Sequence, residues 1–97
     1  MRDAEQLDAL RKEIDAVDAD MLRLLERRVA LSEKIANFKR AHGMGVLDEA
    51  RERQVLEAAA ARVDSALKDE ASLLMETLMA ISKRRQQALL NRPEPRQ

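Results

Sequence analysis

Apolar residues recur every three or four positions through the first forty residues of the chain. They form one seam, whose successive core positions are Leu7, Leu10, Ile14, Val17, Met21, Leu24, Arg28, Leu31, Ile35 and Phe38. Nine of these ten positions are apolar, and a seven-residue repeat of this kind is typical of a helix that packs along another helix. No Gly or Pro interrupts the stretch, which is rich in strong helix formers. The pattern predicts one helix from about Asp3 to about Lys39, roughly 55 Å long.

The next stretch contains both glycines of the chain. Residues 42–47 include Gly43 and Gly45, which tolerate positive φ, and we expect a loop there. Asp48 follows in the position of a helix N-cap, and Glu49 and Glu52 favour the first turn of a helix. A second helix is therefore predicted from this cap to about Arg62.

A short break at Asp64 and Ser65 separates the second helix from a third, with Ser65 or Asp69 as the expected cap. The third helix should continue to about Asn91. One of its faces carries Leu74, Leu78, Ile81, Arg85 and Leu89. Pro93 and Pro95 cannot continue a helix, so we expect one domain over residues 1–91 and a flexible tail over residues 92–97.

Three helices of such unequal length make an all-α chain that is not a compact monomer. Two short helices cannot cover the seam of the long one, and an uncovered seam would be a large apolar stripe. A second copy of the chain, with its long helix antiparallel to the first, would cover it in a two-fold arrangement. The sequence thus predicts an intertwined helical homodimer.

Composition narrows the range of functions. The 97 residues are 45% hydrophobic and 37% charged, with no apolar run long enough to cross a bilayer and no signal-peptide pattern at the start. The 18 basic and 18 acidic residues balance, and Phe38 is the one aromatic residue, which argues against nucleic-acid binding. There is no Cys, and His42 is the single His, so we expect no metal site. A cytoplasmic protein without a cofactor fits these features.

Arg28 is the exception in the apolar seam. A buried Arg is costly unless it is paired. Arg28 is therefore either a structural residue, in a buried ion pair or as a polar residue that sets the register, or a binding group for an anion. Lys39 lies eleven residues further on, nearly on the same face and about 16 Å along the axis. By itself, Lys39 is more simply explained as a cation at a helix C-terminus.

Arg11 lies about 25 Å from Arg28 along the same helix, too far to share a ligand with it. In an antiparallel pair that overlaps fully, Arg11 of one chain would lie near Leu31 of the other, about one turn from Arg28. Each site would then be completed in trans. Without a dimer, a solvated Arg on an amphipathic helix is the better interpretation.

Two further groups of polar residues share helix faces. Asp48, Arg51 and Glu52 lie together at the start of the second helix, and Ser82 and Gln86 lie four residues apart on the third. Separately, these are explained by capping, a surface ion pair and residues at the edge of a core. Taken with Arg28, Lys39 and a partner's Arg11, they predict a cationic pocket for a small dianion that bears a hydroxyl. The pocket offers no nucleophile, metal or acid–base pair.

Four segments resemble the all-α (AroQ) class of chorismate mutases. They are Leu10-Arg11-Lys12-Glu13-Ile14-Asp15 through Leu25-Glu26-Arg27-Arg28, Ile35-Ala36-Asn37-Phe38-Lys39, Asp48-Glu49-Ala50-Arg51-Glu52-Arg53 and Ser82-Lys83-Arg84-Arg85-Gln86-Gln87. The resemblance spans about Leu7 to Leu90. It implies the rearrangement of chorismate to prephenate, in phenylalanine and tyrosine biosynthesis, by orientation and electrostatic preorganisation.

The resemblance also implies a role for each site residue. Arg28 and the partner's Arg11 would hold the two carboxylates of chorismate, and Ser82 and Arg51 would support the carboxylate side. Lys39 and Gln86 would donate to the ether oxygen. Glu52, with the backbone near Asp48, would bind the ring hydroxyl.

Two other functions remain as alternatives. Isochorismate–pyruvate lyases share this fold and a similar cationic site, although Glu52 argues against that activity. A non-catalytic helical dimerisation module would explain the heptads. It would not explain Arg28 in the seam together with Lys39 and Gln86.

Overall fold

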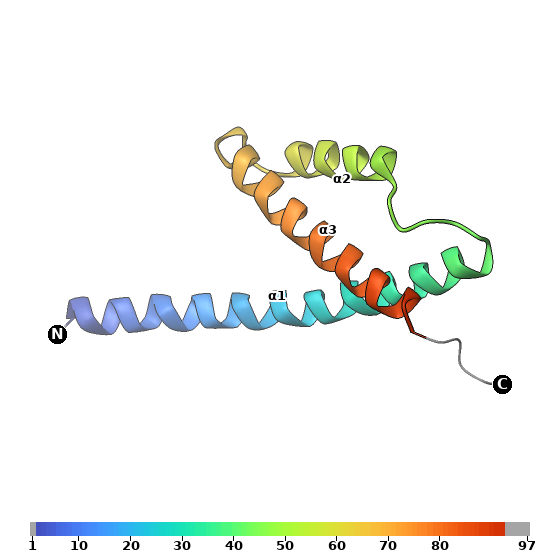
Figure 1. The fold of residues 1–97 in the computed structure, drawn as a ribbon. Helices are drawn as coiled ribbons and strands as arrows, with labels where there is room; N and C mark the ends of the chain where they lie inside the picture. Colours follow the sequence, from blue (N-terminus) through green and yellow to red (C-terminus); the bar gives the residue numbers. More distant parts are fainter. Residues whose placement is uncertain (1, 93–97) are drawn as a thin grey trace.

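A computed structural model describes residues 2–92 and has three α-helices, as the sequence predicts (Figure 1). Helix α1 spans Arg2–Ala41, α2 spans Glu49–Arg62 and α3 spans Lys68–Leu90. A short 3-10 helix, η1 (Ser65–Leu67), precedes α3, and no strand occurs in the described range. The all-α prediction is confirmed. The predicted tail lies outside the described residues from position 93 onward.

The end of α1 explains why a glycine stands at position 43. Gly43 has a φ of +66°, which an L side chain rarely adopts. Around it, the amide of Met44 donates to the carbonyl of Lys39 at 2.8 Å, and the amide of Gly43 donates to that of Arg40 at 3.3 Å. These two bonds form a Schellman motif, which pairs the last carbonyls of the helix and turns the chain into the loop.

Asp48 begins α2 as predicted. Its carboxylate oxygen Oδ1 accepts a hydrogen bond of 3.0 Å from the backbone amide of Arg51. This contact pairs one of the four amides that a helix start leaves free. The cap therefore sets the start of α2 and places Arg51 and Glu52 in its first turn.

The predicted cap of the third helix was wrong. Leu67 is the N-cap of α3 and no side chain caps it, while Ser65 begins η1 and Asp69 lies in the first turn of α3. The reason is the 3-10 turn, in which the amide of Leu67 donates to the carbonyl of Asp64 at 2.8 Å. This turn runs directly into α3, so the backbone enters the helix without a capping side chain.

Helix α3 holds the chain together. It crosses between α2 and the C-terminal part of α1 and packs on both (Figure 1). Its buried residues are Met79, Ser82 and Gln86, and those of α1 are Ser32 and Ala36. The sequence pattern predicts for α3 an apolar face that begins at Leu74. The residues that are buried in the structure lie beside this face, and Leu74 itself is exposed.

The N-terminal part of α1 extends away from the other helices (Figure 1). Every residue from Arg2 to Leu24 is exposed, including the apolar seam positions. The chain is correspondingly elongated, with extents of 62 × 33 × 15 Å. No helix within residues 2–92 combines the length and apolar character needed to cross a bilayer.

Candidate functional site

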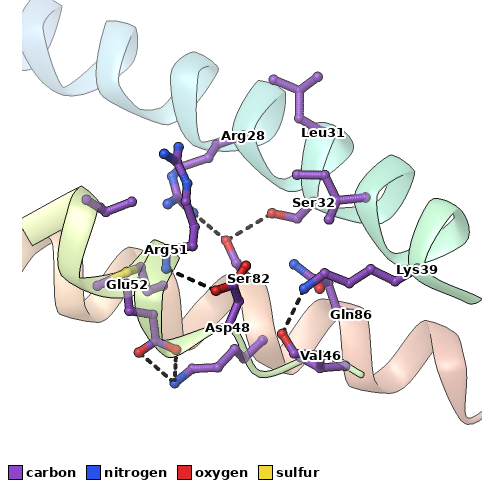
Figure 2. A pocket seen from close by; sticks show the side chains of 14 residues that line it. Arg28, Leu31, Ser32, Lys39, Val46, Asp48, Arg51, Glu52, Ser82 and Gln86 are labelled. Atoms are coloured by element: carbon purple, nitrogen blue, oxygen red, sulfur yellow. Dashed lines mark hydrogen bonds and ion pairs between the residues drawn. The ribbon is translucent and has the colours of Figure 1, made fainter. Parts of the chain in front are cut away.

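A cavity of about 290 Å³ lies where the C-terminal part of α1, the start of α2 and the buried face of α3 meet (Figure 2). It brings together seven of the eight predicted site residues, namely Arg28, Lys39, Asp48, Arg51, Glu52, Ser82 and Gln86. The eighth, Arg11, lies on the exposed part of α1 and does not line this cavity. Its contribution from a partner chain stays a prediction.

Arg28 is held in place by uncharged groups. Its Nη1 donates to the carbonyl oxygen of Leu78 at 3.1 Å and to the hydroxyl of Ser82. Within residues 2–92 it forms no ion pair with a carboxylate. In a single chain, these contacts favour the anion-binding interpretation of Arg28 over the structural ion pair, because its charge remains available to a ligand.

Ser82 and Gln86 face the cavity from α3, one turn apart. Ser82 also accepts a hydrogen bond of 2.9 Å from the hydroxyl of Ser32, which orients it beneath Arg28 (Figure 2). Gln86 is only 6% exposed, yet its Oε1 has no hydrogen-bond partner among the described residues. An unpaired buried amide oxygen is costly, which favours a polar ligand at this position.

Lys39 reaches the cavity from the last turn of α1. Its Nζ donates to the carbonyl oxygen of Val46 at 2.9 Å, and so ties the loop before α2 to α1 (Figure 2). An ammonium has three donors, so at least two remain for a ligand. The loop contact thus orients Lys39 without using up its donors.

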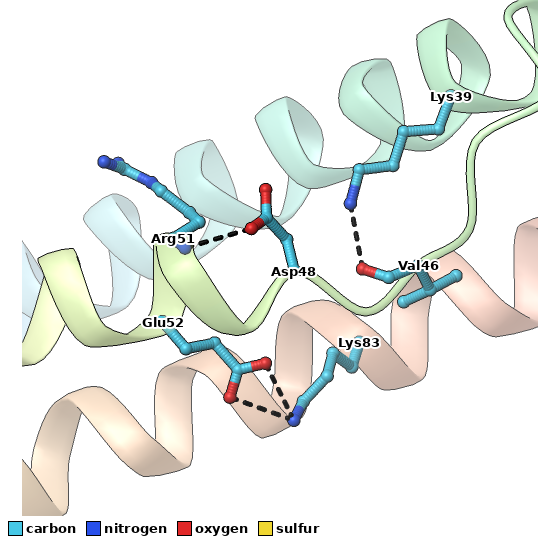
Figure 3. A network of polar contacts seen from close by, with 6 residues as sticks. All are labelled: Lys39, Val46, Asp48, Arg51, Glu52 and Lys83. Atoms are coloured by element: carbon cyan, nitrogen blue, oxygen red, sulfur yellow. Dashed lines mark hydrogen bonds and ion pairs between the residues drawn. The ribbon is translucent and has the colours of Figure 1, made fainter.

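The start of α2 adds charges of both signs (Figure 3). Asp48 and Arg51 are joined by the helix cap, while the carboxylate of Glu52 contacts Lys83 of α3, with Nζ 3.3 Å from Oε2 and 3.4 Å from Oε1. Four cations line the cavity (Arg28, Lys39, Arg51 and Lys83) against two carboxylates (Asp48 and Glu52). The lining is therefore net cationic, as binding of a dianion requires.

Sequence reasoning missed two polar residues of this site. Ser32 is 5% exposed and lies one turn after Arg28 on the same face, a spacing that would have identified it. Lys83 directly follows Ser82 in the sequence, but its contact with Glu52 depends on how α2 meets α3. No sequence spacing gives that contact.

A second cavity, of about 390 Å³, adjoins the first between α2 and α3. Arg28, Arg51 and Val55 line both cavities, and most other residues around the second one are apolar, among them Ala58, Leu74 and Met75. The cationic site is therefore open on this side towards an apolar surface.

The described residues contain no cluster of three His, Asp or Glu side chains that could hold a metal ion. The site instead consists of fixed hydrogen-bond donors of positive charge, one unpaired amide and two carboxylates. Such a set can bind, orient and electrostatically stabilise a small anion. The fold and site together define an all-α chain with a net cationic cavity between its helices.

Comparison with known proteins identifies the family. Residues 10–87 match the model for chorismate mutase type II, and the chain belongs to this family. The match extends over all three helices and over every residue predicted for the site.

Curated relatives cover part of the chain. The intracellular chorismate mutase of Mycobacterium tuberculosis is 40% identical over 52 residues, which are 54% of this chain and 50% of that protein. The bifunctional chorismate mutase/prephenate dehydratase of Aquifex aeolicus is 40% identical over 53 residues, 55% of this chain and 15% of that protein. The 4-amino-4-deoxychorismate mutase of Streptomyces venezuelae is 35% identical over 60 residues, 62% of this chain and 58% of that protein. The chain thus matches between about a seventh and three fifths of these relatives. No solved structure matched.

Proposed function

We propose that this chain is a chorismate mutase that converts chorismate to prephenate. The observation that carries the proposal is the set of groups around one cavity. Arg28 is bonded only to neutral acceptors, Lys39 has spare donors, and the buried amide of Gln86 has an unpaired oxygen. Family membership and the names of the relatives support the same activity.

The reaction needs little chemistry from the protein. In this rearrangement one C–O bond breaks while one C–C bond forms within the same molecule, without proton transfer or a covalent intermediate. The enzyme has to hold a compact conformer and stabilise the negative charge that develops on the ether oxygen. The cavity supplies fixed cations for both purposes, and the proposal assigns no role to a metal or a cofactor.

Each polar group receives a place in this mechanism. Arg28 binds one carboxylate, supported by Ser82, and Arg51 adds positive charge on the same side. Lys39 reaches the second carboxylate region and the ether oxygen. Half a turn of the Gln86 amide exchanges Oε1 for Nε2 at the cavity, which lets Nε2 donate to the ether oxygen.

Glu52 accepts a hydrogen bond from the ring hydroxyl in this arrangement. The backbone beside Asp48 lies at the same end of the cavity, where the N-terminus of α2 begins. A carboxylate is an acceptor only, so it suits a hydroxyl and not a further carboxylate of the ligand.

The active form that we propose is an intertwined homodimer. The seam of α1 from Leu7 to Leu24 is exposed in one chain, and the second cavity opens beside Arg28 and Arg51. A partner's α1 laid against this surface would cover its own seam and bring Arg11 towards Arg28. The dimer would therefore bury apolar surface and complete the cationic site at once.

Two narrower statements belong to the same proposal. Residues 1–91 form one catalytic domain. By analogy with the relatives named intracellular, the protein acts inside the cell, in the formation of aromatic amino acids.

Turnover of chorismate by purified protein tests the proposal, with the product identified by chromatography. We expect prephenate. Lys39→Ala should lower kcat/KM by roughly 100- to 1,000-fold while secondary structure and oligomeric state stay unchanged, because one donor to the developing charge is removed. Lys68→Ala, at an exposed position at the start of α3 that lines neither cavity, is the matched control.

Four results would contradict all or part of the assignment. A folded wild-type protein that leaves chorismate unchanged would exclude the mutase activity. Release of pyruvate from isochorismate would favour the lyase, and no turnover of either compound would favour a non-catalytic dimerisation module. A fully active Lys39→Ala variant would leave the activity standing but remove Lys39 from the site.

A further inference from the structure

The contact between Lys83 and Glu52 gives the cavity a feature that the proposed mechanism does not use. Lys83 lies on α3 and Glu52 on α2, and the Lys83 ammonium lies 3.3 Å and 3.4 Å from the two carboxylate oxygens of Glu52 (Figure 3). It therefore bridges both oxygens. Both residues line the cavity, and Lys83 directly follows Ser82.

This ion pair lies at the wall of the site and is accessible from it. The side chain of Glu52 is 30% exposed and that of Lys83 is 41% exposed. A carboxylate oxygen has two lone pairs, so Glu52 can accept from Lys83 and still accept from a ligand hydroxyl. The ammonium of Lys83 thus balances the negative charge of Glu52, and the Glu52 carboxylate can still accept a hydrogen bond from a ligand.

A ligand group at this end of the cavity meets both charges at once. A neutral hydroxyl gains a hydrogen bond from Glu52 and is indifferent to Lys83. A protonated amine in the same place gains from Glu52 but lies within a few ångströms of a second ammonium. The repulsion between the ligand amine and Lys83 offsets much of the attraction between the amine and Glu52, because the two charges of the ion pair lie at similar distances from the amine.

We propose that Lys83 is a specificity-determining residue, which makes the site select a substrate with a hydroxyl over the same substrate with an amine in its place. The inference rests on the proposed function, since it assumes that the ring substituent of the substrate faces Glu52. Lys83 acts through Glu52 and through its own charge. It takes no part in the bond changes.

The test compares two substrates, chorismate and 4-amino-4-deoxychorismate, whose amine is largely protonated at neutral pH. The measured quantity is the ratio of their kcat/KM values. Wild-type protein should favour chorismate, and Lys83→Met should lower the ratio about tenfold, mainly by improving turnover of the amine. Lys83→Arg, which retains the charge, should preserve the preference. Lys68→Met removes an exposed Lys from the other end of α3 and is the matched control.

The outcomes separate this inference from the function on which it rests. If wild-type protein converts chorismate but Lys83→Met leaves the ratio unchanged, Lys83 only ties α2 to α3, and the specificity role is wrong. An equal fall for both substrates leads to the same conclusion. If wild-type protein converts neither compound, both proposals fail. Lys83→Gln, which still donates a hydrogen bond to Glu52, replaces Lys83→Met in the comparison if that variant does not fold.

Discussion

The two ends of α1 carry the same apolar repeat but have different surroundings. From Arg28 onward, the helix packs on α3 and buries Ser32 and Ala36. From Arg2 to Leu24 it packs on nothing in its own chain. The apolar seam itself is exposed in both parts, with Ile14 58% and Phe38 57% exposed, because α3 covers the face of Ser32 and Ala36 and not the seam. The local sequence is equally helical in both parts, so the difference lies in the partners and not in the propensity.

This comparison indicates how the helix is completed. An isolated helix of some twenty residues is marginal in water, since most helix stability in proteins comes from packing of an apolar face. Single exposed leucines are normal, but a continuous apolar seam is not. The exposed seam of α1 is therefore the surface on which a second copy is expected. The packed part also supplies Arg28, Ser32 and Lys39 to the cavity of its own chain.

The largest effect is expected from a charge in the free seam. If the chain were a monomer, Ile14→Glu would change an exposed residue and alter stability by no more than about 0.5 kcal/mol. In the proposed dimer, it buries an unpaired charge and should weaken association by roughly 100-fold or more, with loss of activity at low protein concentration. Sedimentation at several concentrations measures the association. Ala19→Glu, on the opposite face of α1, serves as control and should remain dimeric.

The next effect tests whether the free end of α1 serves the partner's site. Arg11→Ala and Arg28→Ala should each lose about 100-fold in kcat/KM, since each removes a charge-assisted contact to a carboxylate. When the two variants are unfolded together and refolded, about half of the dimers are mixed, and one of the two sites in each is intact. About a quarter of wild-type activity should return.

A mixture that stays inactive, although mixed dimers are verified by mass spectrometry, would mean that Arg11 does not act across the interface. The N-terminal end of α1 would then serve dimer association alone and would add no residue to the partner's site. The site would have to be completed by other residues.

A third effect concerns the cavity, which lies beside the packed end of α1, and it depends on pH. Gln86 does not titrate, so wild-type activity should not require acid. In Gln86→Glu a carboxylate cannot donate to the ether oxygen, and only the protonated acid can. Activity of this variant should be low at neutral pH and rise as the pH falls. A pH–rate profile measures this, with Gln87→Glu on the exposed side of α3 as control. A flat profile for Gln86→Glu would remove Gln86 as the donor.

Much of this arrangement could be predicted because it follows from local rules. The helical repeat places Arg28 and Lys39 on one face, and Asp48 caps α2 through its own side chain. The start of α3 could not be predicted in the same way, since η1 leads into it and Leu67 makes no side-chain cap. Where a 3-10 turn leads directly into a helix, no capping side chain is needed, so the first residue of the helix cannot be predicted from a capping residue type.

The site shows the same limit. Spacing along the chain identified residues that share a face within each helix, and the structure brings the seven residues from all three helices to one cavity. The bond from Arg28 to Ser82 and the ion pair of Lys83 with Glu52 join different helices. Such contacts depend on how α3 crosses its neighbours, and no periodicity in a single sequence specifies that crossing.

The smallest effect is expected at Ser32, which sequence reasoning missed. Its hydroxyl donates to Ser82, and Ser82 accepts from Arg28, so Ser32 helps to hold the guanidinium in place from the buried side of α1. Ser32→Ala removes one hydrogen bond worth about 1 kcal/mol, so kcat/KM should fall roughly fivefold, mainly through a higher KM. Ser65→Ala, an exposed serine in η1, is the matched control. An unchanged kcat/KM in folded Ser32→Ala would mean that Ser82 and the Leu78 carbonyl alone position Arg28. The hydrogen bond from Ser32 to Ser82 would then add nothing to the placement of the guanidinium.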